Sequence, residues 1–225
     1  MGLTTADIAT PRVAQTVSIQ TYLGAIAGDL IDSLPAISDL SPTDRRGMIA
    51  RYSVVLEGNF IYWMTGAYLA ARSGEAKAII IDNLYEEVRD CHPGMLRRFV
   101  MLADAEPNAP DARAVHANLT QVRLFIGQLS AAPIVVMMAF FEDFIQRFMP
   151  YLADLAASRG SDEREYTEVH GLCDVAHSQA LFHALEKELE LAPDSRASED
   201  HLFEGVHLLK ALIESVIGRH SAEAS

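Results

Sequence analysis

Three residues in the second half of the chain have types and a spacing that suit metal binding. His170, Asp174 and His177 stand at positions i, i+4 and i+7. An α-helix turns about 100° per residue, so these positions share one face within an arc of roughly 60°. The same face continues through apolar residues at Leu181, Ala184 and Leu185. We therefore expect the two imidazoles and the carboxylate to point into the core, where a buried acid needs a partner or a cation.

A hydrogen-bonded cluster without metal would explain this triplet equally well, so the other helices matter. Glu142 is an acid on an apolar stripe, whose other members are Val135, Met138, Ala139, Ile145 and Met149. Glu57 likewise shares its helical face with apolar or aromatic residues, namely Val54, Ile61, Met64 and Tyr68. Both acids are expected to look inward. For either one alone, an acid that caps a buried Arg or Tyr is the alternative.

Two adjacent glutamates, Glu86 and Glu87, face different ways on the predicted helix. Glu86 is in line with charged residues at Glu75, Asp82 and Arg89, which is typical of a solvated face. Glu87 is in line with Ala76, Ile80, Asn83 and Leu84, so we take it as the inward acid, with Glu86 as the open alternative. His92 follows five residues later, a poor helical spacing. It needs a distorted turn, which Pro93-Gly94 makes plausible.

The elements that must position these residues are predicted to be helices throughout. Proline, glycine and capping residues divide the chain into eight helices, at about 14–33, 42–72, 75–90, 95–105, 111–129, 133–158, 161–191 and 198–219. No window alternates with a period of two. The expected fold is therefore an all-α bundle of seven to eight helices, in which antiparallel neighbours bring the inward acids and histidines to one layer. We expect one domain over 1–225, with loose tails at 1–12 and 221–225.

Composition excludes several classes of protein. The 225 residues carry a formal net charge of −13, which argues against a nucleic-acid partner. Two cysteines, Cys91 and Cys173, are too few for a disulfide scaffold or a four-cysteine zinc site. The longest near-apolar run, from 131 to 141, is too short to span a bilayer. No secretory signal is visible, so a cytoplasmic protein without a membrane partner is expected.

The inward charges fit two divalent cations. Two ferrous ions carry four positive charges, and Glu57, Glu87, Glu142 and Asp174 carry four negative charges. Neutral imidazoles of His92, His170 and His177 would complete the ligand set. Carboxylate and imidazole ligands suit iron or manganese, and the absence of thiolate argues against structural zinc. Glu142 and Asp174 both remain candidates for a bridging ligand.

These residues, in this order, resemble the haem-oxygenase-like di-iron oxidases. The resemblance rests on Asn83-Leu-x2-Glu87, then His92, an isolated Glu142, and the element His170-x3-Asp174-x2-His177. It implies a seven-helix bundle that holds two iron ions. These ions would be ferrous in the resting protein and would react with O2, and manganese could replace them. The implied ligands are Glu87, His92, Glu142, His170, Asp174 and His177, with Glu57 as the counterpart of a further glutamate in some members. Arg89 in place of a usual glycine, and the short gap to His92, depart from the pattern.

The resemblance also implies an activity. We expect an O2-dependent oxidase that attacks C–H bonds of a small aliphatic amino acid by desaturation, with carbon–nitrogen ring closure as a further step in natural-product biosynthesis. Fatty-acid oxidative decarboxylation and N-oxygenation on the same site are the rival reactions. The expected partners are a small-molecule substrate, O2 and an external electron donor, and a homodimer is compatible with the sequence. A metal-free relative with the same fold, or a non-enzymatic helical interaction protein, would bind no iron.

Overall fold

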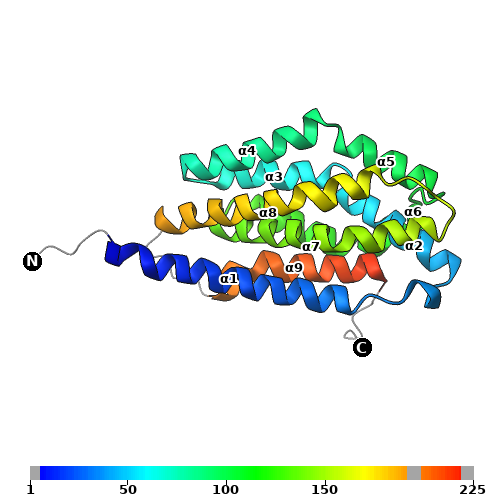
Figure 1. The fold of residues 1–225 in the computed structure, drawn as a ribbon, viewed down its shortest axis with the longest axis horizontal. Coiled ribbons are helices and arrows are strands. Elements are labelled where there is room, and N and C mark those ends of the chain that lie inside the picture. The colour runs from blue at the N-terminus through cyan, green and yellow to red at the C-terminus, as the bar shows by residue number, and fades with distance from the viewer. Residues whose placement is uncertain (1–5, 192–198, 219–225) are drawn as a thin grey trace, which may run out of the picture.

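The protein is a bundle of long α-helices (Figure 1). The structure, a computed structural model, describes residues 6–191 and 199–218, and among them the side chains of 16–191 and 200–218. Within those ranges there is no β-strand. The helices are α1 (Ala6–Asp32), α2 (Pro42–Leu56), α3 (Asn59–Ala70), α4 (Gly74–Arg89), α5 (His92–Leu102), α6 (Ala109–Gly127), α7 (Ala131–Ala157), α8 (Glu165–Leu191) and α9 (Glu199–Ile217), with a short 3-10 turn at Ile37–Asp39.

The predicted all-helical bundle is confirmed, and each predicted helix has a counterpart. Two boundaries differ in a way that matters. The helix predicted over 42–72 is divided into α2 and α3, because Gly58 adopts a left-handed conformation (φ 76°) that ends α2. Helix α1 begins at Ala6, so residues 6–12 are helical where a loose tail was predicted. The tail predicted at 221–225 lies outside the described residues.

Helix α7 forms the centre of the bundle. Every residue from Ile134 to Phe141 is buried, so this part of the helix is apolar on all sides, as expected for a segment surrounded by other helices. It packs most extensively against α8 and also contacts α9, α1 and α3. Figure 1 shows α7 and α8 through the middle of the molecule, with α1 and α9 along one side and α3, α4 and α5 along the other. A polar side chain on the face of α7 that meets α8, or on the inner face of α8, is therefore buried in the core.

Hydrogen bonds at helix ends fix the register of the elements around this centre. The Ser41 hydroxyl accepts from the Asp44 amide at the start of α2, and the Ser73 hydroxyl accepts from the Ala76 amide at the start of α4. Glu188 of α8 is buried, and its Oε1 accepts from the backbone amides of Arg72 and Ser73 at 2.8 and 2.7 Å. This contact ties the start of α4 to the C-terminal half of α8 and sets the height of α4 along it.

None of the helices in the described part of the chain is long and apolar enough to cross a membrane. The most apolar of the long helices, α7, carries Glu142, Asp143 and Arg147 in its middle.

Candidate metal centre

Helix α8 buries the triplet His170, Asp174 and His177. His170, Asp174 and His177 are all buried, and Asp174 is only 2% exposed. They lie on the inner face of α8, which packs against α7 and α4. The helix is regular through this segment, so the i, i+4, i+7 spacing places all three side chains on one side. The predicted inward orientation of the triplet is confirmed.

Glu142 of α7 lies opposite this triplet. Its side chain is 2% exposed, and its Oε2 is 4.0 Å from His177 Nδ1. The neighbouring acid on α7, Asp143, turns aside and pairs with Arg147 one turn later. Glu142 therefore looks inward, as its apolar helical neighbours predicted.

The corner between α4 and α5 brings Glu87 and His92 together. Helix α4 ends at Arg89, Cys91 adopts a left-handed conformation (φ 59°), and α5 begins at His92. His92 Nδ1 then lies 2.8 Å from Glu87 Oε1, with both side chains buried. The distorted turn that the five-residue spacing requires is therefore present.

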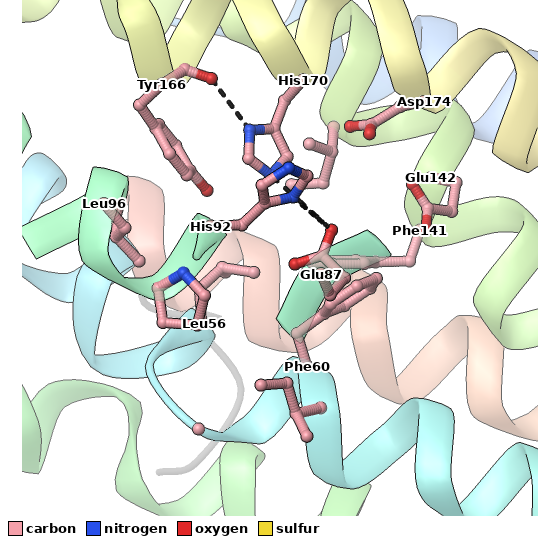
Figure 2. A pocket seen from close by; sticks show the side chains of 14 residues that line it. Leu56, Phe60, Glu87, His92, Leu96, Phe141, Glu142, Tyr166, His170 and Asp174 are labelled. Atoms are coloured by element: carbon pink, nitrogen blue, oxygen red, sulfur yellow. Dashed lines mark hydrogen bonds and ion pairs between the residues drawn. The ribbon is translucent and has the colours of Figure 1, made fainter. Parts of the chain in front are cut away.

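These six side chains form two groups whose possible ligand atoms lie close enough together to hold a metal ion. One group, the Glu87 cluster, contains Glu87, His92 and His170; the other, the Glu142 cluster, contains Glu142, Asp174 and His177. Within each group, one ligand atom from every residue lies within 4.8 Å of the others. Figure 2 shows the His92 and His170 rings beside Glu87, with Asp174 and Glu142 next to them. The α4–α5 corner supplies ligands only to the Glu87 cluster and α7 only to the Glu142 cluster, whereas α8 supplies both.

A protein acceptor holds one nitrogen of each α8 imidazole. His170 Nδ1 donates to the Tyr166 carbonyl oxygen at 2.8 Å (Figure 2), which leaves Nε2 facing the Glu87 cluster, 3.9 Å from Glu87 Oε1. His177 Nε2 donates to Glu86 Oε2 at 2.9 Å, which leaves Nδ1 facing the Glu142 cluster. Such a bond on the far nitrogen sets the tautomer and the ring orientation of a metal-binding histidine.

The buried acids are electrostatically strained in the absence of a cation. Burial raises the pKa of Glu142 well above its usual range, and the charges of Asp174 and Glu87 raise it further. Burial and the charge of Glu87 likewise raise the pKa of Asp174. Burial disfavours the charged form of His92, but the hydrogen bond and charge of Glu87 outweigh it and raise the pKa of that imidazole. A cation between the acids would relieve the repulsion.

Unpaired polar atoms in the Glu142 cluster indicate that its side chains would bind a cation. Glu142 Oε1, Asp174 Oδ2 and His177 Nδ1 are buried without a hydrogen-bond partner. Buried polar atoms are nearly always paired, so three unpaired atoms from one cluster, whose residues each bring a ligand atom within 4.8 Å of the others, have the chemistry of a cation site. In the Glu87 cluster, a metal ion would replace the proton that Glu87 and His92 share. The residues present therefore fit two divalent metal ions.

Glu57 is not part of this centre, contrary to the sequence prediction. It is the last residue before Gly58, where α2 ends, and its side chain is 42% exposed. Its Oε1 accepts from Arg97 Nε of α5 at 2.6 Å. The prediction assumed an unbroken helix over 42–72, and the change of direction at Gly58 turns this carboxylate to the surface. The Gly58-Asn59 pair was the sequence signal for that break.

Two further residues, Glu86 and Tyr166, take part in the site in ways that the sequence did not indicate. Glu86 was placed on the solvated face, and its side chain is indeed 44% exposed, yet its carboxylate reaches His177. Tyr166 acts through its backbone carbonyl, for which side-chain identity gives no signal. Its ring also packs against His170, with centroids 4.3 Å apart, and its hydroxyl is 2.7 Å from that of Tyr52.

A pocket with mostly apolar walls opens onto both clusters. Five of the six cluster residues line it, all except His177. The remaining lining is Leu56, Gly58, Phe60, Ile61, Pro93, Leu96, Phe141, Ile145 and Tyr166. Figure 2 shows Leu56, Phe60 and Leu96 across the pocket from Asp174 and Glu142. No lysine or arginine belongs to this lining, so the acids and imidazoles are its only ionisable groups besides Tyr166.

The chain matches no protein-family model, no curated protein and no solved structure. The resemblance to haem-oxygenase-like di-iron oxidases therefore stays a prediction from the motif.

Proposed function

We propose that the protein is an O2-dependent, non-haem di-iron oxidase that acts on an aliphatic C–H bond of a small organic substrate. The observation that carries this proposal is the pair of adjacent, buried ligand clusters at one wall of an apolar pocket. Metal sites built in a bundle core from Glu and His of facing helices are the pattern of di-iron carboxylate proteins.

The donor atoms favour iron among the common metals. The Glu87 cluster offers two imidazoles and one carboxylate, the donor set of many non-haem Fe(II) oxygenases. The Glu142 cluster offers two carboxylates and one imidazole, which suits iron or manganese. Neither Cys91 nor Cys173 belongs to a cluster, so no thiolate favours zinc or copper(I). With three side chains in each cluster, bound ions would keep coordination positions open for O2 and substrate.

The charge balance favours a substrate with one negative group. With Glu57 outside the centre, Glu87, Glu142 and Asp174 carry three negative charges against the four positive charges of two ferrous ions. The surplus positive charge would attract a substrate carboxylate. Because no lysine or arginine lines the pocket, the ions themselves would be the counter-charge for this group.

The chain's own residues orient the metal ligands and keep water away from the substrate. The Tyr166 carbonyl keeps His170 Nδ1 protonated, so that its Nε2 lone pair faces the Glu87 cluster. Phe60, Phe141 and Ile145 surround the reacting end of the substrate with apolar atoms, which keeps water away from it. Bound iron would supply the O2 chemistry that side chains lack. Desaturation removes two electrons from the substrate and O2 takes four, so an external donor must supply the other two.

Within this class, we propose a small aliphatic amino acid as the first candidate substrate, with desaturation as the reaction. The apolar walls suit an aliphatic side chain, and the surplus positive charge suits the carboxylate. One observation favours fatty-acid oxidation as a second candidate. A further, fully apolar cavity between α2, α7 and α9 shares Leu56, Phe141 and Ile145 with the pocket. An alkyl tail longer than an amino-acid side chain could extend into it.

Anaerobic Fe(II) titration of the metal-free protein tests the proposal. Two equivalents should bind to the native protein, and His170→Ala and Glu142→Gln should each lose at least one. Asp143→Asn is the matched control, because it changes the neighbouring acid on α7 that pairs with Arg147 outside the clusters. Failure of the native protein to bind iron stoichiometrically would refute the di-iron site.

Once metal binding is established, substrate turnover tests the proposed reaction. O2 uptake by the iron-loaded protein should be accelerated by an aliphatic amino acid or a straight-chain fatty acid, and mass spectrometry of the product identifies the reaction. Acceleration by neither class, in a protein that binds two ions, would exclude both substrates.

A further inference from the structure

Glu86 and Glu87 are consecutive on α4, yet each points to a different cluster. Glu87 is buried and belongs to the Glu87 cluster directly. Glu86 is partly exposed and belongs to neither cluster, but its Oε2 lies 2.9 Å from His177 Nε2. The adjacent pair therefore reaches both clusters from one turn of helix.

The hydrogen-bonding capacity of imidazole determines what the Glu86 contact does. A neutral imidazole carries a proton on one nitrogen and a lone pair on the other. A carboxylate only accepts hydrogen bonds, so His177 Nε2 must carry the proton. The lone pair is then on Nδ1, which lies 3.8 Å from Asp174 Oδ1 and 4.0 Å from Glu142 Oε2 and has no partner.

We propose that Glu86 is a positioning residue, which holds His177 in the tautomer and orientation that present Nδ1 to a metal ion in the Glu142 cluster. This inference rests on the proposed metal centre for its purpose, but the tautomer itself exists without metal. It also assigns different roles to the two glutamates: Glu87 is the ligand and Glu86 acts through His177.

The comparison with His170 shows why Glu86 matters. Both α8 imidazoles have one nitrogen held by an acceptor and the other facing a cluster. For His170 the acceptor is a backbone carbonyl of the same helix, which no substitution removes. For His177 the acceptor is a side chain from another helix, so α4 must be docked on α8 for the histidine to be oriented. Through this contact, the orientation of His177 in the Glu142 cluster depends on the position of α4.

Two variants separate positioning from direct ligation. Glu86→Gln keeps an oxygen that can accept the His177 Nε2 proton but has no charge to bind metal well, whereas Glu86→Ala removes the acceptor. If Glu86 positions His177, Glu86→Gln should bind two equivalents of Fe(II) with affinities within about 3-fold of the native protein. Glu86→Ala should weaken one of the two equivalents by about 10- to 100-fold, the usual effect of losing an outer partner of a metal-binding histidine.

The matched control is Glu75→Ala. His183 Nε2 lies 2.9 Å from Glu75 Oε1, so the same kind of bond joins the same two helices, but outside both clusters. This variant should leave both binding affinities unchanged. A loss equal to that of Glu86→Ala would mean that docking of α4 in general, and not His177, is responsible, and it would overturn the proposal.

A second readout needs no metal. Long-range ¹⁵N–¹H correlation spectra of the metal-free protein report the tautomer of each histidine ring, and His177→Asn identifies the signals. His177 should be protonated on Nε2 in the native protein and in Glu86→Gln, and should become a mixture in Glu86→Ala. A native Nδ1–H tautomer would overturn the proposal even if two ions bind. Equal losses of metal in Glu86→Gln and Glu86→Ala would also overturn it, because they would make the carboxylate a ligand. If the native protein binds no metal but shows the Nε2–H tautomer, the oxidase fails and the positioning contact stands.

Discussion

At the scale of single residues, together with that of Asp174, the carboxyl group of Glu142 makes the stability of the metal-free protein depend on pH. Burial and the charges of Asp174 and Glu87 raise its pKa above the ordinary value of 4.5. An acid with a higher pKa in the folded protein binds its proton more tightly there. Its stabilising contribution is therefore complete below the unfolded pKa and is lost as the pH rises through the folded pKa.

We expect the free energy of unfolding of the metal-free protein to fall as the pH rises above about 4.5, with a slope of up to about 1.4 kcal/mol per pH unit for one such group. Urea unfolding in the presence of a chelator, at several pH values between about 5 and 8, measures this slope. Glu142→Gln should reduce this slope, with Asp174 still contributing, and Asp143→Asn should leave it unchanged. Equal slopes in the native protein and Glu142→Gln would contradict the pKa shift.

Glu57 provides a second test at this scale, because the motif and the structure disagree about it. Its carboxylate pairs with Arg97 at the surface, away from both clusters. We expect Glu57→Gln to bind two equivalents of Fe(II) with the native affinities. Metal analysis after anaerobic gel filtration checks this, with Glu142→Gln as the variant that loses metal. Loss of an equivalent in Glu57→Gln would restore it as a ligand and would require α2 to extend past Gly58 in the metal-bound protein.

At the scale of elements, the break between α2 and α3 depends on one glycine. Gly58 has a φ of 76°, and a Cβ atom there would meet nothing within 4 Å, so the cost of Gly58→Ala is conformational and not steric. We expect this variant to lose about 1 kcal/mol of unfolding free energy. Gly28→Ala is the control, since Gly28 lies in α1 with equal space and no positive φ. It should gain up to about 1 kcal/mol. Thermal and urea unfolding compare the two, and a loss in both would contradict the explanation.

The elements also show what sequence patterns can and cannot predict here. Helical periodicity correctly turned His170, Asp174, His177 and Glu142 inward, because α7 and α8 are long and unbroken. It failed at Glu57, because a single left-handed glycine ends the periodic pattern. Glu86 could not be predicted, since a half-exposed acid that reaches another helix depends on how α4 docks on α8. That docking involves the Glu188 contact with the α3–α4 corner, more than 100 residues apart in sequence.

The cavity between α2, α7 and α9 gives a test of substrate size. Leu212 of α9 lines this cavity but not the pocket at the metal clusters. Leu212→Phe should fill it, so we expect turnover of a straight-chain fatty acid to fall by about 10-fold or more while turnover of a short aliphatic amino acid is kept, in line with the cost of crowding an apolar pocket. O2 uptake with each substrate measures the effect. Equal losses with both substrates would show that the cavity takes no part in selecting chain length.

At the scale of the whole molecule, the two clusters join parts of the chain that are also held together by apolar packing and by polar contacts such as that of Glu188 with the Arg72 and Ser73 amides. The α4–α5 corner, α7 and α8 each supply ligands, and the chain as a whole carries a net charge of −13. Three inward carboxylates add to that self-repulsion in the core, where screening by water is weakest. Divalent cations at the clusters would cancel this repulsion and link the three parts, so metal binding and global stability should be coupled.

Binding of Mn(II), used in place of Fe(II) to avoid reaction with O2, tests this coupling between metal binding and stability. A ligand that binds only the folded protein at 100 times its dissociation constant adds about 2.7 kcal/mol of stability for each site. We expect this gain with Mn(II) in the native protein and in Glu75→Ala, and at most half of it in Glu142→Gln. The gain should also increase with pH, because Glu142 and Asp174 must lose protons to bind the ion, while the metal-free protein loses stability over the same range. Urea unfolding at matched pH, with and without Mn(II), compares the two trends. A constant gain at all pH values would mean that the ion binds elsewhere on the acidic surface, and no gain at any Mn(II) concentration would leave the six buried residues as a structural polar network.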